Sequence, residues 1–339
     1  MSESMVRQFW PGWKGPIKEG DSGWNNTTRY IENKGRNCVL RIYETHRDRE
    51  KIEFEHEILA RLQEIPLSFQ VPFPVRTPEG DSIIRMEDGS GRFACLFEYI
   101  EGVRPQHEGF VAAHSFGQAA AELVEALKTV NTDLAPSYRP YYELHQSYPI
   151  CDYETVRKFC EHPPEAFREQ HDAILVLGEA YDKICDRLED LRNLPHQLVH
   201  GDLNPSNLLV YEDHPEEIAA LLDFEFCTRD VRAMEPAVVI SDLLGYGDKR
   251  ENIRQFCEGF GKRLRLKTEE IANIPSLIRL RKVDVFLHFL SRYLKGTDGP
   301  AVLKSQVESL AAELEELKRD EIWIREILRE HLLDRLGLD

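Results

Sequence analysis

The sequence has few cysteines, and no two of them form a CxxC pair. The seven cysteines are scattered and odd in number, which argues against a disulfide framework or a structural zinc site. No run of about 18 apolar residues occurs, so no transmembrane helix is predicted. The opening MSESMVRQFWPGW also lacks the apolar core of a signal peptide. These absences predict a protein of the reducing cytoplasm with no membrane as partner.

Positive charge is scarce relative to negative charge. The 339 residues include 60 Asp or Glu and 43 Lys or Arg, which gives a net charge of −17. A protein this acidic repels nucleic acid and anionic membrane surfaces, so we expect neither as a partner. Its hydrophobic content of 42% suffices for a sizeable core. The length favours two lobes or domains, and nothing in the sequence indicates the oligomeric state.

Motifs of several common enzyme classes are missing. The sequence contains no Walker A motif, no GxGxxG fingerprint, no GxSxG elbow and no HExxH zinc motif. These patterns mark P-loop nucleotide hydrolases, dinucleotide-binding enzymes, α/β-hydrolases and zinc metalloproteases. The sequence therefore favours none of those classes.

The first hundred residues are rich in predicted strands. Residues 27–32 and 38–43 read as two strands joined by a turn, which predicts a hairpin. A charged helix follows at about 47–64, with apolar residues at helical spacing. Two further strands are predicted at 82–85 and 93–99. This pattern predicts a small lobe, residues 1–100, with an antiparallel sheet and one helix.

The remainder of the chain is mostly helical. Long helices are predicted at 110–130, 163–191 and 300–336, with i,i+4 charge pairs along the last of them. A strand-and-loop insert at about 198–230 interrupts the helical pattern. We therefore expect an α+β fold in which the small lobe joins a larger, mostly helical lobe, residues 101–339.

The most informative segment lies in that insert. It reads LVHGDLNPSNLLV from Leu198 and is followed by LLDFE from Leu221. Phosphoryl transfer needs a carboxylate at the attacking hydroxyl and Mg²⁺ at the phosphates, and Mg²⁺ prefers carboxylate and amide oxygens. Asp202 can be the base, and Asn207 and Asp223 can hold the metal. Alternatively these residues belong to a turn, a helix cap and a strand end, but their order between apolar runs favours the catalytic interpretation.

HGDLNPSN followed by LLDFE resembles the aminoglycoside phosphotransferase and choline kinase superfamily, with type II homoserine kinases among its closer-looking members. The resemblance spans roughly residues 20–240. It implies a protein-kinase-like fold that uses ATP and Mg²⁺, with Asp202 as catalytic base and Asn207 and Asp223 as magnesium ligands. Asn204 stands where many relatives have His or Asp. Glu225 stands where protein kinases have Gly.

The same resemblance suggests where the nucleotide binds. Residues 20–27 resemble the loop that covers the phosphates, with Gly23 letting backbone N–H groups approach phosphate oxygens. An ordinary loop would explain this stretch equally well. Residues 97–102, FEYIEG, resemble a kinase hinge in which the backbone of Glu98 and Ile100 binds adenine. An ordinary strand end is the alternative there.

A strand of the small lobe supplies a basic residue for the phosphates. The period of two places Val39 and Arg41 on one strand face, where kinases have a small apolar residue and a Lys. Arg also grips phosphate, although its reach and geometry differ from those of Lys. Glu55 fits the helix carboxylate that pairs with this residue, with Glu57 as the rival. The alternative is that Arg41 and the glutamate are both solvated.

The expected activity is transfer of the ATP γ-phosphate to a hydroxyl of a small metabolite. Homoserine or another amino alcohol is favoured as acceptor, and an aminoglycoside or a sugar is the alternative. A protein kinase, an inactive kinase-like structural protein and an ATP-binding regulator are the rival classes. Glu235 can brace the active-site loop, or it can be a surface residue. The aromatic residues of 136–142 can line the acceptor pocket or serve only in packing.

Overall fold

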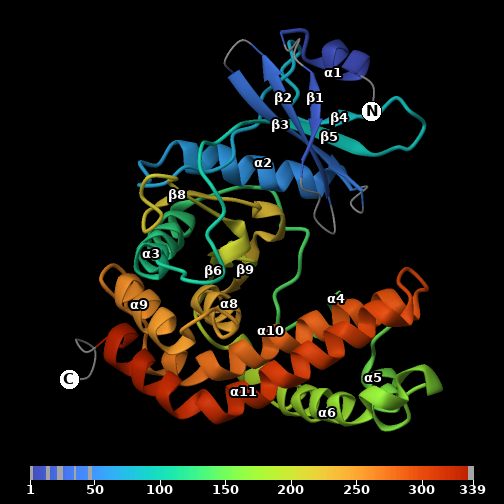
Figure 1. The fold of residues 1–339 in the computed structure, drawn as a ribbon, viewed down its shortest axis with the longest axis vertical. Helices are drawn as coiled ribbons and strands as arrows, with labels where there is room; N and C mark the ends of the chain where they lie inside the picture. The colour runs from blue at the N-terminus through green and yellow to red at the C-terminus, as the bar shows by residue number, and fades with distance from the viewer. Residues whose placement is uncertain (1–2, 13–15, 21–25, 34–35, 45–47, 335–339) are drawn as a thin grey trace.

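The computed structural model describes residues 3–12, 16–20, 26–33, 36–44 and 48–334. A sheet-containing part lies above a larger helical part (Figure 1), as the sequence predicts. Gly23 lies outside the described residues. The helix expected to reach residue 336 ends earlier, at Leu332, because the backbone of Leu333 is extended. Within the described part, no helix is long and apolar enough to cross a membrane.

The small lobe is built on one antiparallel sheet with strand order β1-β2-β3-β5-β4. The predicted hairpin is present, because Thr28 on β2 faces Arg41 on β3. The strands are β1 (Ile17–Glu19), β2 (Asn26–Asn33), β3 (Arg36–Tyr43), β4 (Ile84–Arg85) and β5 (Phe93–Glu98).

Alternation along β3 divides its side chains between two hydrophobic clusters. Tyr43 packs in the main core with the buried stripe of α2 (Arg49–Gln63), and Arg41 shares that face of the strand. Leu40 and Ile42 face the other way, into a smaller cluster that includes Trp10. The predicted phase of β3 is therefore confirmed.

The small lobe has a second helix that the sequence pattern did not reveal. Helix α1 (Glu3–Phe9) covers the sheet face opposite α2 (Figure 1). Val6 and Trp10 are buried there, and the Trp10 indole donates to the Val75 carbonyl at 2.9 Å. The expectation of one helix was therefore wrong, because seven residues are too few to show a clear helical period.

One of the long helices predicted for the large lobe is divided into shorter segments. Helix α3 (Ala113–Thr129) matches expectation, but the helix predicted at 163–191 is broken into a 3₁₀ segment, α6 and α7. Phe167 has non-helical backbone angles within the 3₁₀ segment and anchors it in the core. The helices after α3 are α4 (Leu144–Ser147), α5 (Tyr153–Glu161), α6 (His171–Cys185), α7 (Leu188–Arg192), α8 (Met234–Leu243), α9 (Lys249–Gly261), α10 (Thr268–Leu294) and α11 (Pro300–Leu332).

Two short strand pairs form the predicted insert. Strand β6 (His196–Val199) pairs with β9 (Thr228–Val231), and β7 (Leu208–Val210) pairs with β8 (Ile218–Leu221). The HGDLNPSN segment therefore connects β6 to β7, and DFE connects β8 to β9. This nesting brings two segments that are apart in sequence to one place, between the sheet and the helices (Figure 1).

Candidate active site

The loop after β6 has a fixed shape around Gly201. Its φ is +82°, and a Cβ there would lie 2.7 Å from the Phe226 carbonyl oxygen, so glycine is needed. The Asp202 amide donates to His200 Nδ1 at 3.3 Å, and His200 Nε2 lies 2.9 Å from the Leu222 carbonyl oxygen. The buried imidazole therefore links the HGD loop to the strand end before Asp223.

Asparagine side chains tie down the backbone of Asp202. The Nδ2 atoms of Asn204 and Asn207 each donate to the Asp202 carbonyl at 2.9 Å. Asn207 Nδ2 also lies 3.3 Å from Asp202 Oδ2. Asn204 accepts in turn from the Ser206 amide at 2.9 Å. Asn204 thus holds the loop by bonds to both sides of Pro205.

The Asp202 carboxylate faces a partner that sequence analysis missed. Arg281 on α10 donates to Asp202 Oδ1 at 2.5 Å. Burial raises the pKa of Asp202 to about 6; Arg281 opposes the shift and Asp223 adds to it. No motif surrounds Arg281, and only the tertiary packing of α10 brings it to the loop.

Asp223 occupies an unusual backbone position beside Asn207. Its φ and ψ are 66° and 63°, in the left-handed region that non-glycine residues rarely adopt. The preceding Leu222 amide donates to the Asn207 carbonyl at 2.9 Å. Asp223 Oδ1 is buried and has no hydrogen-bond partner among the described residues. A strained backbone and a buried carboxylate oxygen without a hydrogen bond are both typical of a functional site.

Arg41 and Glu55 form the predicted pair. Arg41 Nη1 donates to Glu55 Oε1 at 3.0 Å and lies 3.4 Å from Asp223 Oδ1. Burial lowers the pKa of Arg41, but the carboxylates of Asp223 and Glu55 more than offset this and raise it overall. Tyr43 donates to the other Glu55 oxygen at 3.0 Å. The rival Glu57 instead pairs with Arg61 at 2.9 Å.

Two glutamates near the motifs also have defined partners. Glu235 is fully buried on α8 and accepts the Gly201 amide at 2.9 Å, so it braces the loop rather than lying at the surface. Glu225 accepts from Asn26 on β2 at 2.8 Å. The DFE segment therefore contacts the small lobe twice, through Asp223 and through Glu225.

Tyr141 of the 136–142 segment contacts the HGD loop and Arg281. The Tyr141 hydroxyl donates to the Gly201 carbonyl at 2.6 Å and accepts from Arg281 Nη1 at 2.9 Å. Its backbone amide donates to Asp230 on β9 at 2.6 Å. This part of the segment therefore supports the loop and borders the space beside Asp202.

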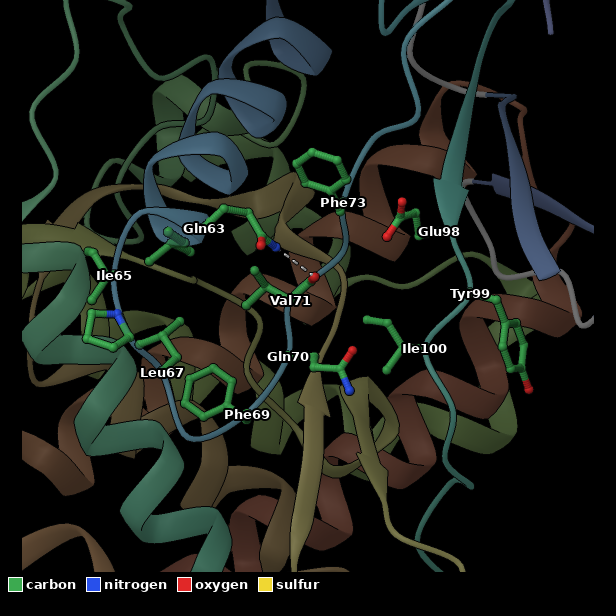
Figure 2. Close-up of a pocket in the computed structure, with 12 residues that line it drawn as sticks. Gln63, Ile65, Leu67, Phe69, Gln70, Val71, Phe73, Glu98, Tyr99 and Ile100 are labelled. Atoms are coloured by element: carbon green, nitrogen blue, oxygen red, sulfur yellow. Dashed lines mark hydrogen bonds between the residues drawn. The ribbon is translucent and has the colours of Figure 1, made fainter. Parts of the chain in front are cut away.

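Residues 97–102, expected to form a hinge, border a cavity of the small lobe. Glu98 and Ile100 point into this cavity of about 470 Å³, which is also bordered by Gln70 and Phe73, while Tyr99 points away (Figure 2). The cavity lining contains neither Arg41 nor Asp223, so this cavity is separate from the ion-pair cluster. In the described chain, the Ile100 amide has no hydrogen-bond partner.

Comparison with known proteins agrees with this geometry. The sequence model of the phosphotransferase enzyme family matches residues 16–271. The chain belongs to the phosphotransferase enzyme family. It is 24% identical over 290 residues to a homoserine kinase of Rhizobium etli, covering 83% of this chain and 82% of that protein. It is 27% identical over 218 residues to a homoserine kinase of Nitrobacter hamburgensis, covering 61% and 59% of the two chains.

Solved structures of other kinases share the fold. A microcompartment-associated aminopropanol kinase superposes with a TM-score of 0.72 at 19% identity, covering 96% of this chain and 99% of that one. An amicoumacin kinase in complex with AMP-PNP, Ca²⁺ and Ami gives a TM-score of 0.66 at 19% identity, covering 93% of this chain and 94% of that one. The predicted family, the protein-kinase-like fold and the class of small-molecule kinase acting on hydroxyl groups are thereby confirmed.

The Glu235 contact generates a test of the loop. Glu235→Ala removes the acceptor of the buried Gly201 amide, so we expect unfolding to become easier by about 1–3 kcal/mol and kcat to fall. Glu235→Gln keeps an acceptor oxygen and should retain most of the stability and most of the kcat. Urea-induced unfolding and steady-state kinetics measure the two effects. Equal stability and kcat for Glu235→Ala and the wild type would mean that the contact does not brace the loop.

Proposed function

We propose that this protein transfers the γ-phosphate of ATP to a hydroxyl of a small metabolite, with homoserine or another amino alcohol favoured. The observation that carries the proposal is the convergence of Arg41, Glu55 and Asp223 on one side of the site, with Asp202 and Asn207 on the other. The relatives named as homoserine and aminopropanol kinases support the choice of acceptor.

The residues at Asp223 fit a divalent cation. Asp223 Oδ1 has Arg41 Nη1 at 3.4 Å as an ion-pair partner but accepts no hydrogen bond within the described structure. Asn207 directs its Nδ2 to Asp202, which leaves the amide oxygen available. One carboxylate and one amide suit Mg²⁺, which keeps several waters and binds phosphates. We propose that Asp223 and Asn207 hold Mg²⁺. When bound, the metal would neutralise charge on the β- and γ-phosphates.

The small lobe is proposed to hold the nucleotide. Arg41 faces Asp223 from β3 and can donate to phosphate while Glu55 fixes its orientation. Val39 lies on the same strand face and would contact adenine, whose edge would bind the backbone of Glu98 and Ile100. Gly23 would contribute to the phosphate loop. The boundary near residue 100 between a nucleotide-binding lobe and an acceptor-binding lobe is part of this proposal, as is action in the cytoplasm.

Asp202 is proposed as the catalytic base. Its backbone is fixed by Asn204 and Asn207, so its carboxylate can orient the acceptor hydroxyl and take its proton during attack on the γ-phosphate. Asp242 and Asp284 add negative charge near Asp202. Besides burial, the Asp242 carboxylate raises the pKa of Asp202, and the Asp202 carboxylate raises the pKa of Asp284. An acidic acceptor site suits an ammonium-bearing substrate.

The direct experiment is an ADP-release screen with ATP and Mg²⁺ against amino alcohols, hydroxy amino acids, aminoglycosides and sugars. We expect turnover with an amino alcohol or homoserine. Asp202→Asn should reduce kcat by about 10²–10⁴-fold, because a general base contributes that much, while ATP–Mg²⁺ still raises the melting temperature. No acceptor-dependent ADP release would refute the proposed activity. An active Asp202→Asn variant would refute only the role of Asp202.

Arg41 provides a second test, because Lys is the usual residue at this place. Arg41→Ala should weaken use of ATP by roughly 1.5–3 kcal/mol if one charge-assisted hydrogen bond is lost. Arg41→Lys keeps the charge and should keep part of the activity. Kinetics with varied ATP on folded protein measure this, and Arg61→Ala, which removes a surface partner of Glu57, is the matched control. If Arg41→Ala has the wild-type kcat and KM for ATP, the phosphates are held elsewhere.

A further inference from the structure

One face of α10 borders the proposed acceptor site. Arg281 and Asp284 are one helical turn apart on this face, with Arg281 Nη1 3.9 Å from Asp284 Oδ2. The side chains of Arg281, Asp284 and Asp202 are 19%, 17% and 18% exposed, so each still reaches open space. A cation and two carboxylates thus share one partly open site.

Arg281 restricts the base in the absence of an acceptor. Its Nη2 donates to Asp202 Oδ1 at 2.5 Å, and the other carboxylate oxygen lies 3.3 Å from Asn207 Nδ2. Both oxygens of Asp202 therefore already have donors. A carboxylate oxygen can accept a second hydrogen bond, but the guanidinium on Oδ1 lowers the pKa of Asp202 and so weakens it as a base. Transfer of Arg281 to another anion would make Asp202 a better acceptor of the hydroxyl proton.

Tyr141 keeps Arg281 at the site during such an exchange. Its hydroxyl accepts from Arg281 Nη1 at 2.9 Å and donates to the Gly201 carbonyl at 2.6 Å. The guanidinium is therefore anchored through one nitrogen and can turn its other nitrogen from Asp202 to a new acceptor. A planar guanidinium suits a carboxylate, which can accept two parallel hydrogen bonds.

We propose that the acceptor is a hydroxy amino acid whose carboxylate binds Arg281 and whose ammonium binds Asp284. The inference rests on the proposed function and narrows its substrate class. An acceptor that carries only positive charge would leave Arg281 on Asp202 and would also be repelled by it. The substrate carboxylate instead replaces Asp202 as the partner of Arg281 and leaves Oδ1 to the hydroxyl. Because Arg281 and Asp202 are in contact, a small molecule can reach both.

The test uses substrate pairs that differ only by the carboxylate. Homoserine is matched with 3-amino-1-propanol, and threonine with 1-amino-2-propanol. For at least one pair, the wild-type full-length protein should prefer the acid by about tenfold or more in kcat/KM, as expected for a hydrogen bond to a charged group. Arg281→Ala should abolish this preference, mainly by raising KM for the acid. Arg281→Lys should retain part of this preference. Asp284→Asn should lower kcat/KM for both substrates of a pair.

Arg279→Ala is the matched control, because Arg279 lies on the same helix and pairs with Glu321 on α11. It should keep the wild-type preference, and a melting-temperature rise with ATP–Mg²⁺ should show that each variant is folded. Equal or better use of the amino alcohols by the wild type would overturn the inference, as would a preference that persists in Arg281→Ala. Turnover of only aminoglycosides or sugars would overturn it and leave the phosphotransferase activity standing. If none of the acceptors stimulated ADP release, the proposed function itself would be refuted.

Discussion

The site depends on the ion pairs of Arg41. This residue connects β3, α2 and the strand end after β8, because its guanidinium meets both Glu55 and Asp223. Glu55 is almost fully buried, so removing its partner would leave an uncompensated buried charge, typically a loss of about 3–5 kcal/mol. The cluster thus sets the position of the small lobe relative to Asp223, and Asn26–Glu225 adds a second link between the same parts.

The large lobe holds the HGD loop through hydrogen bonds within the loop and through contacts from residues far away in the sequence. Asn204, Asn207 and His200 fix the loop from within, while Glu235 and Tyr141 hold Gly201 from α8 and from the 136–142 segment. Such preorganisation is what phosphoryl transfer requires from a protein, because the reaction depends mainly on positioning and on charge stabilisation. The left-handed backbone of Asp223 has a free-energy cost that this packing offsets.

Local patterns made much of this arrangement predictable. The HGD and DFE segments are short and contiguous, and the period of two predicted the face of Arg41. Its pairing with Glu55 was an expectation from the resemblance to kinases. Helix α1 and the break at Phe167 were missed, because short helices give weak periodicity and tertiary packing overrides propensity. Arg281 was missed for a different reason: its role comes from the crossing of α10 behind the loop, and no local sequence pattern encodes that contact.

The most direct test of the account is whether ATP stabilises the protein in a metal-dependent manner. Melting temperatures should be measured with ATP, with ATP and Mg²⁺, and after addition of EDTA, for the wild type, Asp223→Asn and the exposed control Glu212→Gln. ATP–Mg²⁺ at a hundred times its Kd should stabilise the wild type and the control by about 2.7 kcal/mol. EDTA and Asp223→Asn should each remove most of this gain. No shift at millimolar ATP–Mg²⁺, or a full shift in Asp223→Asn, would contradict the proposed nucleotide and metal site.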